Sequence, residues 1–146
     1  MELQFQDTPL YFLRSITSQQ KTQEQTQEVR IPDGMPDIGS VLGAWGQVLL
    51  RSKQWNTNSL GLSAGVMVWI LYAPEEEGPP ATMEVWIPFQ EKFDLPDTGG
   101  REGTVHCDFL LTDVDARNTS ARKLFVRVNV DTRVDAMTQT FDVVKH

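Results

Sequence analysis

The chain has 146 residues, enough for one domain with a full hydrophobic core, and a composition of 40% apolar and 23% charged residues excludes wholesale disorder. The net charge of −7 disfavours binding to nucleic-acid phosphates and to anionic membranes. A single cysteine, Cys107, excludes an internal disulfide, and its alternating surroundings predict a small buried side chain.

The N-terminal part divides into three stretches with different signals. Residues 1–7 lack the basic and apolar regions of a signal peptide, and no apolar run can span a bilayer, so we expect a cytoplasmic protein without membrane insertion. Residues 10–16 are aromatic and branched, which predicts a strand. Residues 18–28 are mostly Gln, Thr, Lys and Glu, and a strand, a helix and a link all remain open. We expect residues 1–28 to pack on the main domain.

A turn is expected next, because residues 31–38 contain two prolines and a glycine. Pro36 then fits the first position of a short helical turn near residues 36–42, with Ile38, Val41 and Leu42 on one face. Two acidic residues in this segment, Asp33 and Asp37, lack the ligand series of a calcium loop and are interpreted as turn and capping residues.

Two-residue periodicity begins at Ala44 and is strongest in residues 60–72 and 83–89, which predict two strands joined by a Glu-rich loop. Turns are expected at residues 56–59 and 96–100. If the two strands form a hairpin, the pattern favours a register with the pairs Tyr72–Met83, Ile70–Val85, Val68–Ile87, Val66–Phe89 and Trp69–Trp86.

Alternating apolar residues also predict strands around residues 105–111 and 124–134. The expected fold is therefore all-β, an antiparallel β-sandwich or a partly open barrel. We expect the main β domain to cover residues 29–136 and residues 137–146 to be a C-terminal tail or a linker to further domains.

Catalytic chemistry has little support in this sequence. Its two histidines, His106 and His146, lie on a strand and at the last residue, away from any convergent set of acids and bases. No metal-binding, phosphate-binding or nucleophile motif is present, and Asn118 in a glycosylation-like triplet is interpreted as part of a turn. We predict a protein that is not an enzyme and needs no cofactor or metal.

The reverse side of the predicted hairpin carries an apolar group made of Met67, Trp69, Leu71 and Trp86. Another part of the chain, such as residues 10–16 or a second sheet, would bury this group in the simplest interpretation. Exposed, it would form a partner-binding surface, since exposed apolar patches and tryptophans mark interfaces. Edge strands offer a second way to bind a protein.

Residues 29–42, with the sequence Val-Arg-Ile-Pro-Asp-Gly-Met-Pro-Asp-Ile-Gly-Ser-Val-Leu, resemble the opening of the SPOCS domain of endospore-forming bacteria. Further segments similar to that family follow in its order: residues 46–50, 70–72, the Glu-rich loop, 84–89, and Asn118 with 122–124 after an insertion. The resemblance covers about residues 28–134. Many family members carry several copies and a peptidoglycan-binding LysM module. Neither is present in this sequence, which weakens any expectation of wall anchoring.

The resemblance implies a role in spore coat assembly, in the mother-cell cytoplasm and at the forespore surface. It also implies a protein partner, the morphogenetic ATPase of the basal coat layer, and brings no catalytic residues with it. Our first hypothesis is therefore a protein-interaction module for coat assembly. The alternative is a carbohydrate-binding β domain in which Trp69 and Trp86 stack on the sugar rings of cell-wall glycans.

Overall fold

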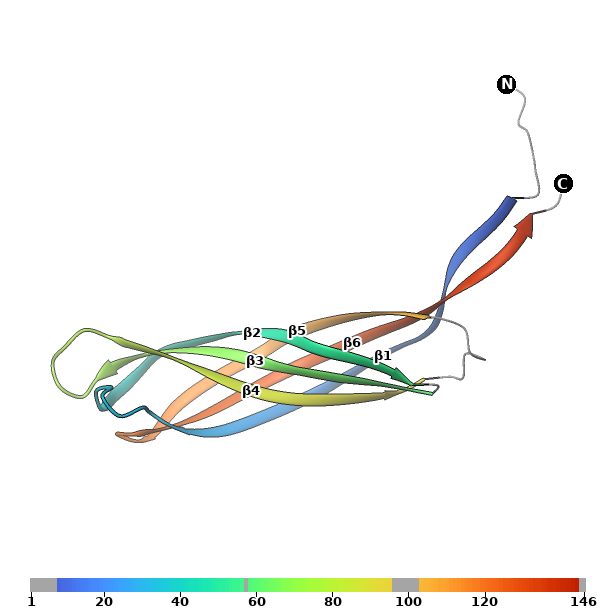
Figure 1. Ribbon diagram of the computed structural model, residues 1–146. Coiled ribbons are helices and arrows are strands. Elements are labelled where there is room, and N and C mark those ends of the chain that lie inside the picture. Colours follow the sequence, from blue (N-terminus) through green and yellow to red (C-terminus); the bar gives the residue numbers. More distant parts are fainter. Residues whose placement is uncertain (1–7, 57, 96–102, 145–146) are drawn as a thin grey trace, which may run out of the picture.

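The computed structural model describes residues 8–56, 58–95 and 103–144, with side chains placed for residues 18–56, 58–95 and 104–137. Its six strands are β1 (Thr8–Arg30), β2 (Ile38–Asn56), β3 (Ser59–Pro74), β4 (Ala81–Asp94), β5 (Gly103–Ser120) and β6 (Lys123–Val144). They form two three-stranded antiparallel sheets, β1-β6-β5 and β2-β3-β4, which face each other without closing into a barrel (Figure 1). This confirms the predicted all-β fold as a sandwich.

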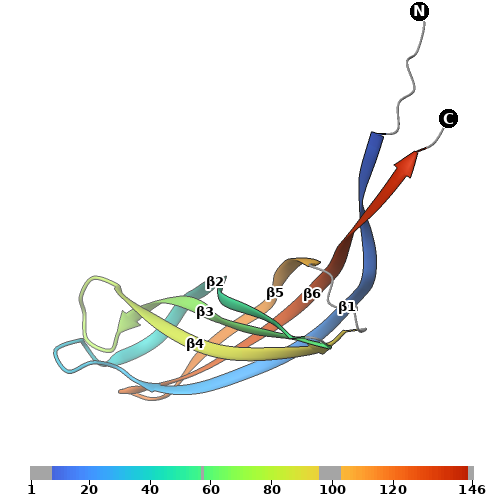
Figure 2. The ribbon, with the colours of Figure 1, turned by 45° about the vertical axis from the view of Figure 1, so that its right-hand side comes forward.

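The two ends of the described chain lie together, because β1 and β6 pair from Thr8–Val144 to Arg30–Lys123. Since β5 begins at Gly103, opposite Thr138, β1 and β6 continue beyond it as a two-stranded ribbon that projects from the sandwich (Figures 1 and 2). The domain boundaries expected after residues 28 and 136 both fall inside these strands, so neither coincides with the end of an element. The expected turn at residues 96–100 and the terminal His146 lie outside the described residues.

The polar residues 18–28, which sequence alone could not assign, belong to β1. Apart from Lys21, their side chains alternate between half-buried at odd positions and exposed at even positions. Three odd-numbered side chains donate to backbone carbonyls of the edge strand β4: Gln19 to Asp94 at 2.6 Å, Gln23 to Gln90 at 3.1 Å, and Lys21 to Lys92. Polar groups face inward here because they cap the unpaired carbonyls of a sheet edge.

The short helical turn predicted near residues 36–42 is wrong, since β2 begins at Ile38 and the described residues contain no helix. Register shifts after Ile38 and after Val41 insert extra residues into β2. Because of these bulges, Ile38 and Val41 both pack against the core although they are three residues apart, while Leu42 is 54% exposed. The bulged strand thus produced the three-residue spacing that suggested a helix.

The guanidinium of Arg122, in the turn between β5 and β6, holds the connection between β1 and β2. This group donates to the carbonyls of Met35 at 2.6 Å and Pro32 at 2.9 Å, and to the Asp37 carboxylate at 3.0 Å. Asp33 lies exposed in the turn, next to a glycine with a φ of 94°. Both aspartates thus serve the turn, and the described part of the chain holds no group of three or more acidic, His or Cys side chains suited to a metal.

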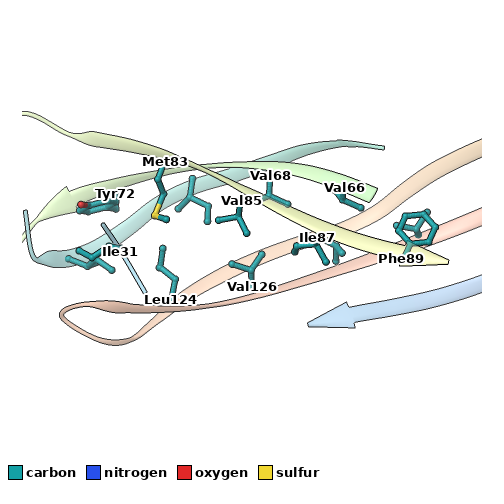
Figure 3. Close-up of a cluster of buried hydrophobic side chains, with 14 of the residues drawn as sticks. Ile31, Val66, Val68, Tyr72, Met83, Val85, Ile87, Phe89, Leu124 and Val126 are labelled. Carbon is teal, nitrogen blue, oxygen red and sulfur yellow. The ribbon is translucent and has the colours of Figure 1, made fainter. Parts of the chain in front are cut away.

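The interior consists of two apolar clusters. The larger one lies between β3, β4 and β6 and includes Tyr72, Val68, Ile87, Leu124 and Val126 (Figure 3). The smaller one contains Leu60, Leu62, Phe93, Leu95, Val105, Val134 and Ala136. Cys107 faces this second cluster but is half-buried rather than buried as its pattern predicted, and desolvation raises the pKa of its thiol.

Strands β3 and β4 form the predicted hairpin, but the predicted register is wrong. The observed pairs are Tyr72–Ala81, Ile70–Met83, Val68–Val85, Val66–Ile87 and Trp69–Glu84, so each expected partner lay two residues too far along the chain. A shift of two keeps every side chain on its own face, and periodicity therefore cannot detect it. The observed register shortens the connection to residues 73–80 and sets Trp86 opposite Met67, diagonal to Gly65.

Candidate docking surface

All four residues predicted as a partner-binding site lie half-buried on the outer face of the β2-β3-β4 sheet. Strand β2 adds two residues to this face, Trp45 at 51% exposed and Leu49 at 39% exposed. Trp45 is the register partner of Trp69. We call this set the tryptophan face: Trp45, Leu49, Met67, Trp69, Leu71 and Trp86. Alternation already placed Trp45 and Leu49 on one side of a strand, but no sequence signal paired that strand with β3.

The indole of Trp86 lies flat across the neighbouring strand, in a space that a glycine leaves open. A Cβ added at Gly65 would meet three atoms of the six-membered ring at 2.2–2.6 Å, so any larger residue would displace the ring. The guanidinium of Arg51 stands 4.6 Å from the ring centroid. At this distance a cation–π attraction stabilises the position of the ring.

Trp69 is also held in place, because its indole N–H donates to the Glu84 carboxylate across the strand pair at 3.2 Å. Its polar edge thus has a partner within the sheet, while its ring is half-exposed. Trp45 is the most exposed of these indoles. The tryptophan face therefore has two fixed rings, Trp69 and Trp86, beside one that is open to solvent.

A polar groove of about 410 Å³ continues the same face beyond Trp86. Small residues of β3, Gly61 and Ser63 among them, form its floor. Longer amide and amino side chains from the neighbouring strands form its walls: Gln54, Asn56, Gln90 and Lys92. This groove offers hydrogen-bond donors and acceptors next to an apolar surface.

The expectation that residues 10–16 or the second sheet bury the tryptophan face is wrong. Residues 10–16 belong to β1, which lies in the other sheet, and that sheet packs on the opposite side of β2-β3-β4. Among the described strands, none crosses the tryptophan face (Figures 1 and 2). The face is thus an apolar surface that the described part of the chain leaves open.

The outer face of the β1-β6-β5 sheet has a different chemistry. Many of its cross-strand pairs are polar or charged: Ser18 bonds Asp135 at 2.6 Å, Thr22 bonds Asp131 at 2.8 Å, and Arg127 pairs with Asp113 at 3.2 Å. Two apolar side chains, Leu110 and Phe125, are exposed among them without forming a group of tryptophans. His106 lies on this face with its Nε2 3.2 Å from Oδ1 of Asp108, and both side chains are 63% exposed. An isolated, solvated pair of this kind resembles a surface contact rather than a catalytic dyad.

In comparisons with known proteins, no family model, curated protein or solved structure matches this chain. Within the described residues, no helix has the length and apolar content needed to cross a membrane.

Proposed function

We propose that this domain is a non-catalytic protein-interaction module that binds its partner through the tryptophan face. The observation that carries the proposal is the pairing of Trp45 with Trp69 on a sheet face that no other described strand covers. Tryptophan is among the residues most enriched in binding hot spots, and contiguous exposed apolar surface marks interaction sites.

Docking on this face is favoured over strand addition at the β4 edge. Side chains of β1 already occupy the carbonyls of Gln90, Lys92 and Asp94 along that edge. Because alternate residues of a strand point their backbone groups the same way, Pro88 belongs to the same edge row, and it has no N–H to donate. An incoming strand would have to displace the β1 side chains from these carbonyls. It would also lack a backbone N–H donor opposite it at Pro88.

A protein partner is favoured over a sugar because of how the rings are covered. Stacking on a pyranose needs a free aromatic face, but Trp86 packs on Gly65 and has the Arg51 guanidinium over its ring. The N–H of Trp69 is used by Glu84. What remains is a mixed apolar surface with one prominent side chain, Trp45, which suits a pocket on another protein.

The resemblance of residues 29–42 to the SPOCS domain supplies the setting for this proposal. We propose that the module acts in spore coat assembly, in the mother-cell cytoplasm and at the forespore surface. The proposed partner is the morphogenetic ATPase of the basal coat layer.

The test is calorimetric titration of the chain with that purified ATPase. Trp45→Ala should weaken binding about 30-fold, the effect of losing a hot spot of about 2 kcal/mol. Leu110→Ala is the matched control, since Leu110 is 63% exposed on the opposite outer face, and it should leave affinity unchanged. Equal binding by wild type and a folded Trp45→Ala variant would exclude the tryptophan face, and no binding by wild type would exclude this partner.

The polar groove supports a second candidate function, the binding of a cell-wall glycan. Its amide and hydroxyl groups could pair with sugar hydroxyls. Titration with soluble glycan fragments separates the two functions. Glycan binding predicts a change in tryptophan fluorescence that Gln54→Ala and Gln90→Ala abolish, whereas the protein-docking proposal predicts no response.

A further inference from the structure

Three buried oxygen atoms in the interior have no hydrogen-bond partner among the described protein groups. They are Oε1 of Gln23, Oε2 of Glu91 and Oγ1 of Thr132. Thr132 is fully buried, and the Glu91 side chain is only 10% exposed. Buried polar atoms in folded proteins are hydrogen-bonded as a rule, so three unpaired atoms in one region require an explanation.

The three atoms come from β1, β4 and β6, from positions that contacts and register bring into one region. Lys21 is the register partner of Thr132, and Gln23 lies two residues further along the same side of β1. The Lys21 ammonium is 3.9 Å from the other carboxylate oxygen of Glu91, while the Gln23 amide donates to the carbonyl of Gln90, next to Glu91. One polar site therefore takes side chains from β1, β4 and β6.

The chemistry of this site suits water. The amide oxygen of Gln23 and the carboxylate oxygen of Glu91 can only accept a hydrogen bond. The hydroxyl of Thr132 can donate one as well as accept one. A water molecule donates two bonds and accepts two, which matches this set. A bound metal cation is disfavoured because the Lys21 ammonium stands beside the single carboxylate.

The surroundings of the site explain why polar groups are confined to it. The larger apolar cluster reaches Val130 of β6, and the smaller one begins at Val134. Thr132 lies midway between them on the same side of the strand. Thr132 thus interrupts the apolar series of β6 on the side of β1, while its β5 partner Phe109 packs against both clusters.

We propose that the sandwich holds at least one structural water molecule at this site, bound by Gln23, Glu91 and Thr132. Such a molecule links both sheets and completes the set of contacts through which β1 covers the edge of β4. It would be exchanged with solvent far more slowly than surface water because these atoms are buried.

The experiment detects the water directly in the wild-type chain by NMR, through cross-peaks between long-lived water and the Thr132 and Gln23 groups. The expected result is a cross-peak at both positions that survives in Thr132→Ser, which keeps the hydroxyl, and is lost in the near-isosteric Thr132→Val. Absence of the cross-peaks in the wild-type chain would overturn the proposal.

A wild-type cross-peak that persists unchanged in Thr132→Val would also overturn the proposal, since the water would then be bound elsewhere. Should Thr132→Val fail to fold, Gln23→Leu removes a different acceptor and is expected to abolish the same signal. In that variant, an unchanged cross-peak at Thr132 would count against the site.

Discussion

The two outer faces of the sandwich are built from the same strand alternation but carry opposite chemistry. On the β1-β6-β5 sheet the outward positions hold bonded pairs such as Thr22 with Asp131, and exposed apolar residues such as Leu110 stand among polar neighbours. On the β2-β3-β4 sheet they hold Trp45 opposite Trp69, with Trp86 across Gly65. Both sheets bury apolar residues on their inner faces, so the fold requires neither outer surface. The apolar residues of the tryptophan face therefore have no role in joining the two sheets.

The largest effect is expected from Trp69→Ala. Loss of the ring removes the centre of the tryptophan face, and we expect partner affinity to fall by at least about 2 kcal/mol, the scale of a hot-spot residue. Calorimetry measures the affinity, and circular dichroism establishes that the variant is folded. A folded Trp69→Ala variant that binds at wild-type strength would show that the two faces do not differ in function.

Gly65→Ala should have the next largest effect, since the new Cβ occupies the space of the Trp86 ring. We expect a stability loss of about 1–3 kcal/mol, typical of overpacking, together with a change in tryptophan fluorescence. Gly61→Ala is the matched control on the same face of the same strand, where the nearest atom to a Cβ is 3.9 Å away. Equal denaturant midpoints for the two variants would contradict the packing of Trp86 on Gly65.

Arg51→Gln tests the cation–π contact between the Arg51 guanidinium and the Trp86 ring. The variant keeps a polar side chain but removes the cation, so we expect a stability loss of about 0.5–1 kcal/mol, the range for an exposed cation–π contact. Chemical denaturation measures this loss. If the stability difference between variant and wild type disappears at high salt, the loss comes from interactions of Arg51 with other charges and not from its contact with the ring.

A pH experiment tests the interior beneath both faces. Desolvation raises the pKa of the Glu91 carboxyl above its ordinary value of 4.5, an effect that Lys21 partly opposes. The folded state therefore binds this proton more tightly than the unfolded state, and Glu91 makes its full contribution to stability below pH 4.5 and loses it as the pH rises through the folded-state pKa. Glu91→Gln should thus gain stability relative to wild type at pH 7.

The gain should shrink as the pH falls towards 4.5, and thermal unfolding across this range measures it. A constant difference between Glu91→Gln and wild type would show that titration of this carboxyl is not the cause. Partner affinity at pH 7 should be the same for both proteins, since Glu91 lies on neither outer face.

The smallest effect is expected on the polar outer face. Thr22→Val removes the exposed bond to Asp131, and surface changes of this kind stay within about 0.5 kcal/mol. Affinity and the denaturant midpoint should both match wild type. A clear loss of partner affinity would show that the partner also contacts the outer face of the β1-β6-β5 sheet.

Most strands with an apolar inner face, and the side on which their residues lie, follow from the sequence alone. Two-residue periodicity placed Met67, Trp69, Leu71 and Trp86 together on the reverse of the β3-β4 hairpin, as the structure has them. This succeeded because alternation between two faces is a property of the extended backbone alone.

Strand pairing and the cover over each face depend on packing between strands, which alternation does not express. A register slip of two residues preserves both faces, so only the packing of Trp86 on Gly65 and the length of the loop select the pairing. The polar part of β1 became a strand because its glutamines and Lys21 bond carbonyls on β4, a partner invisible in the sequence. Likewise, Trp45 joined Trp69 because β2 pairs with β3, and the face stayed open because β1 pairs with β6 in the other sheet.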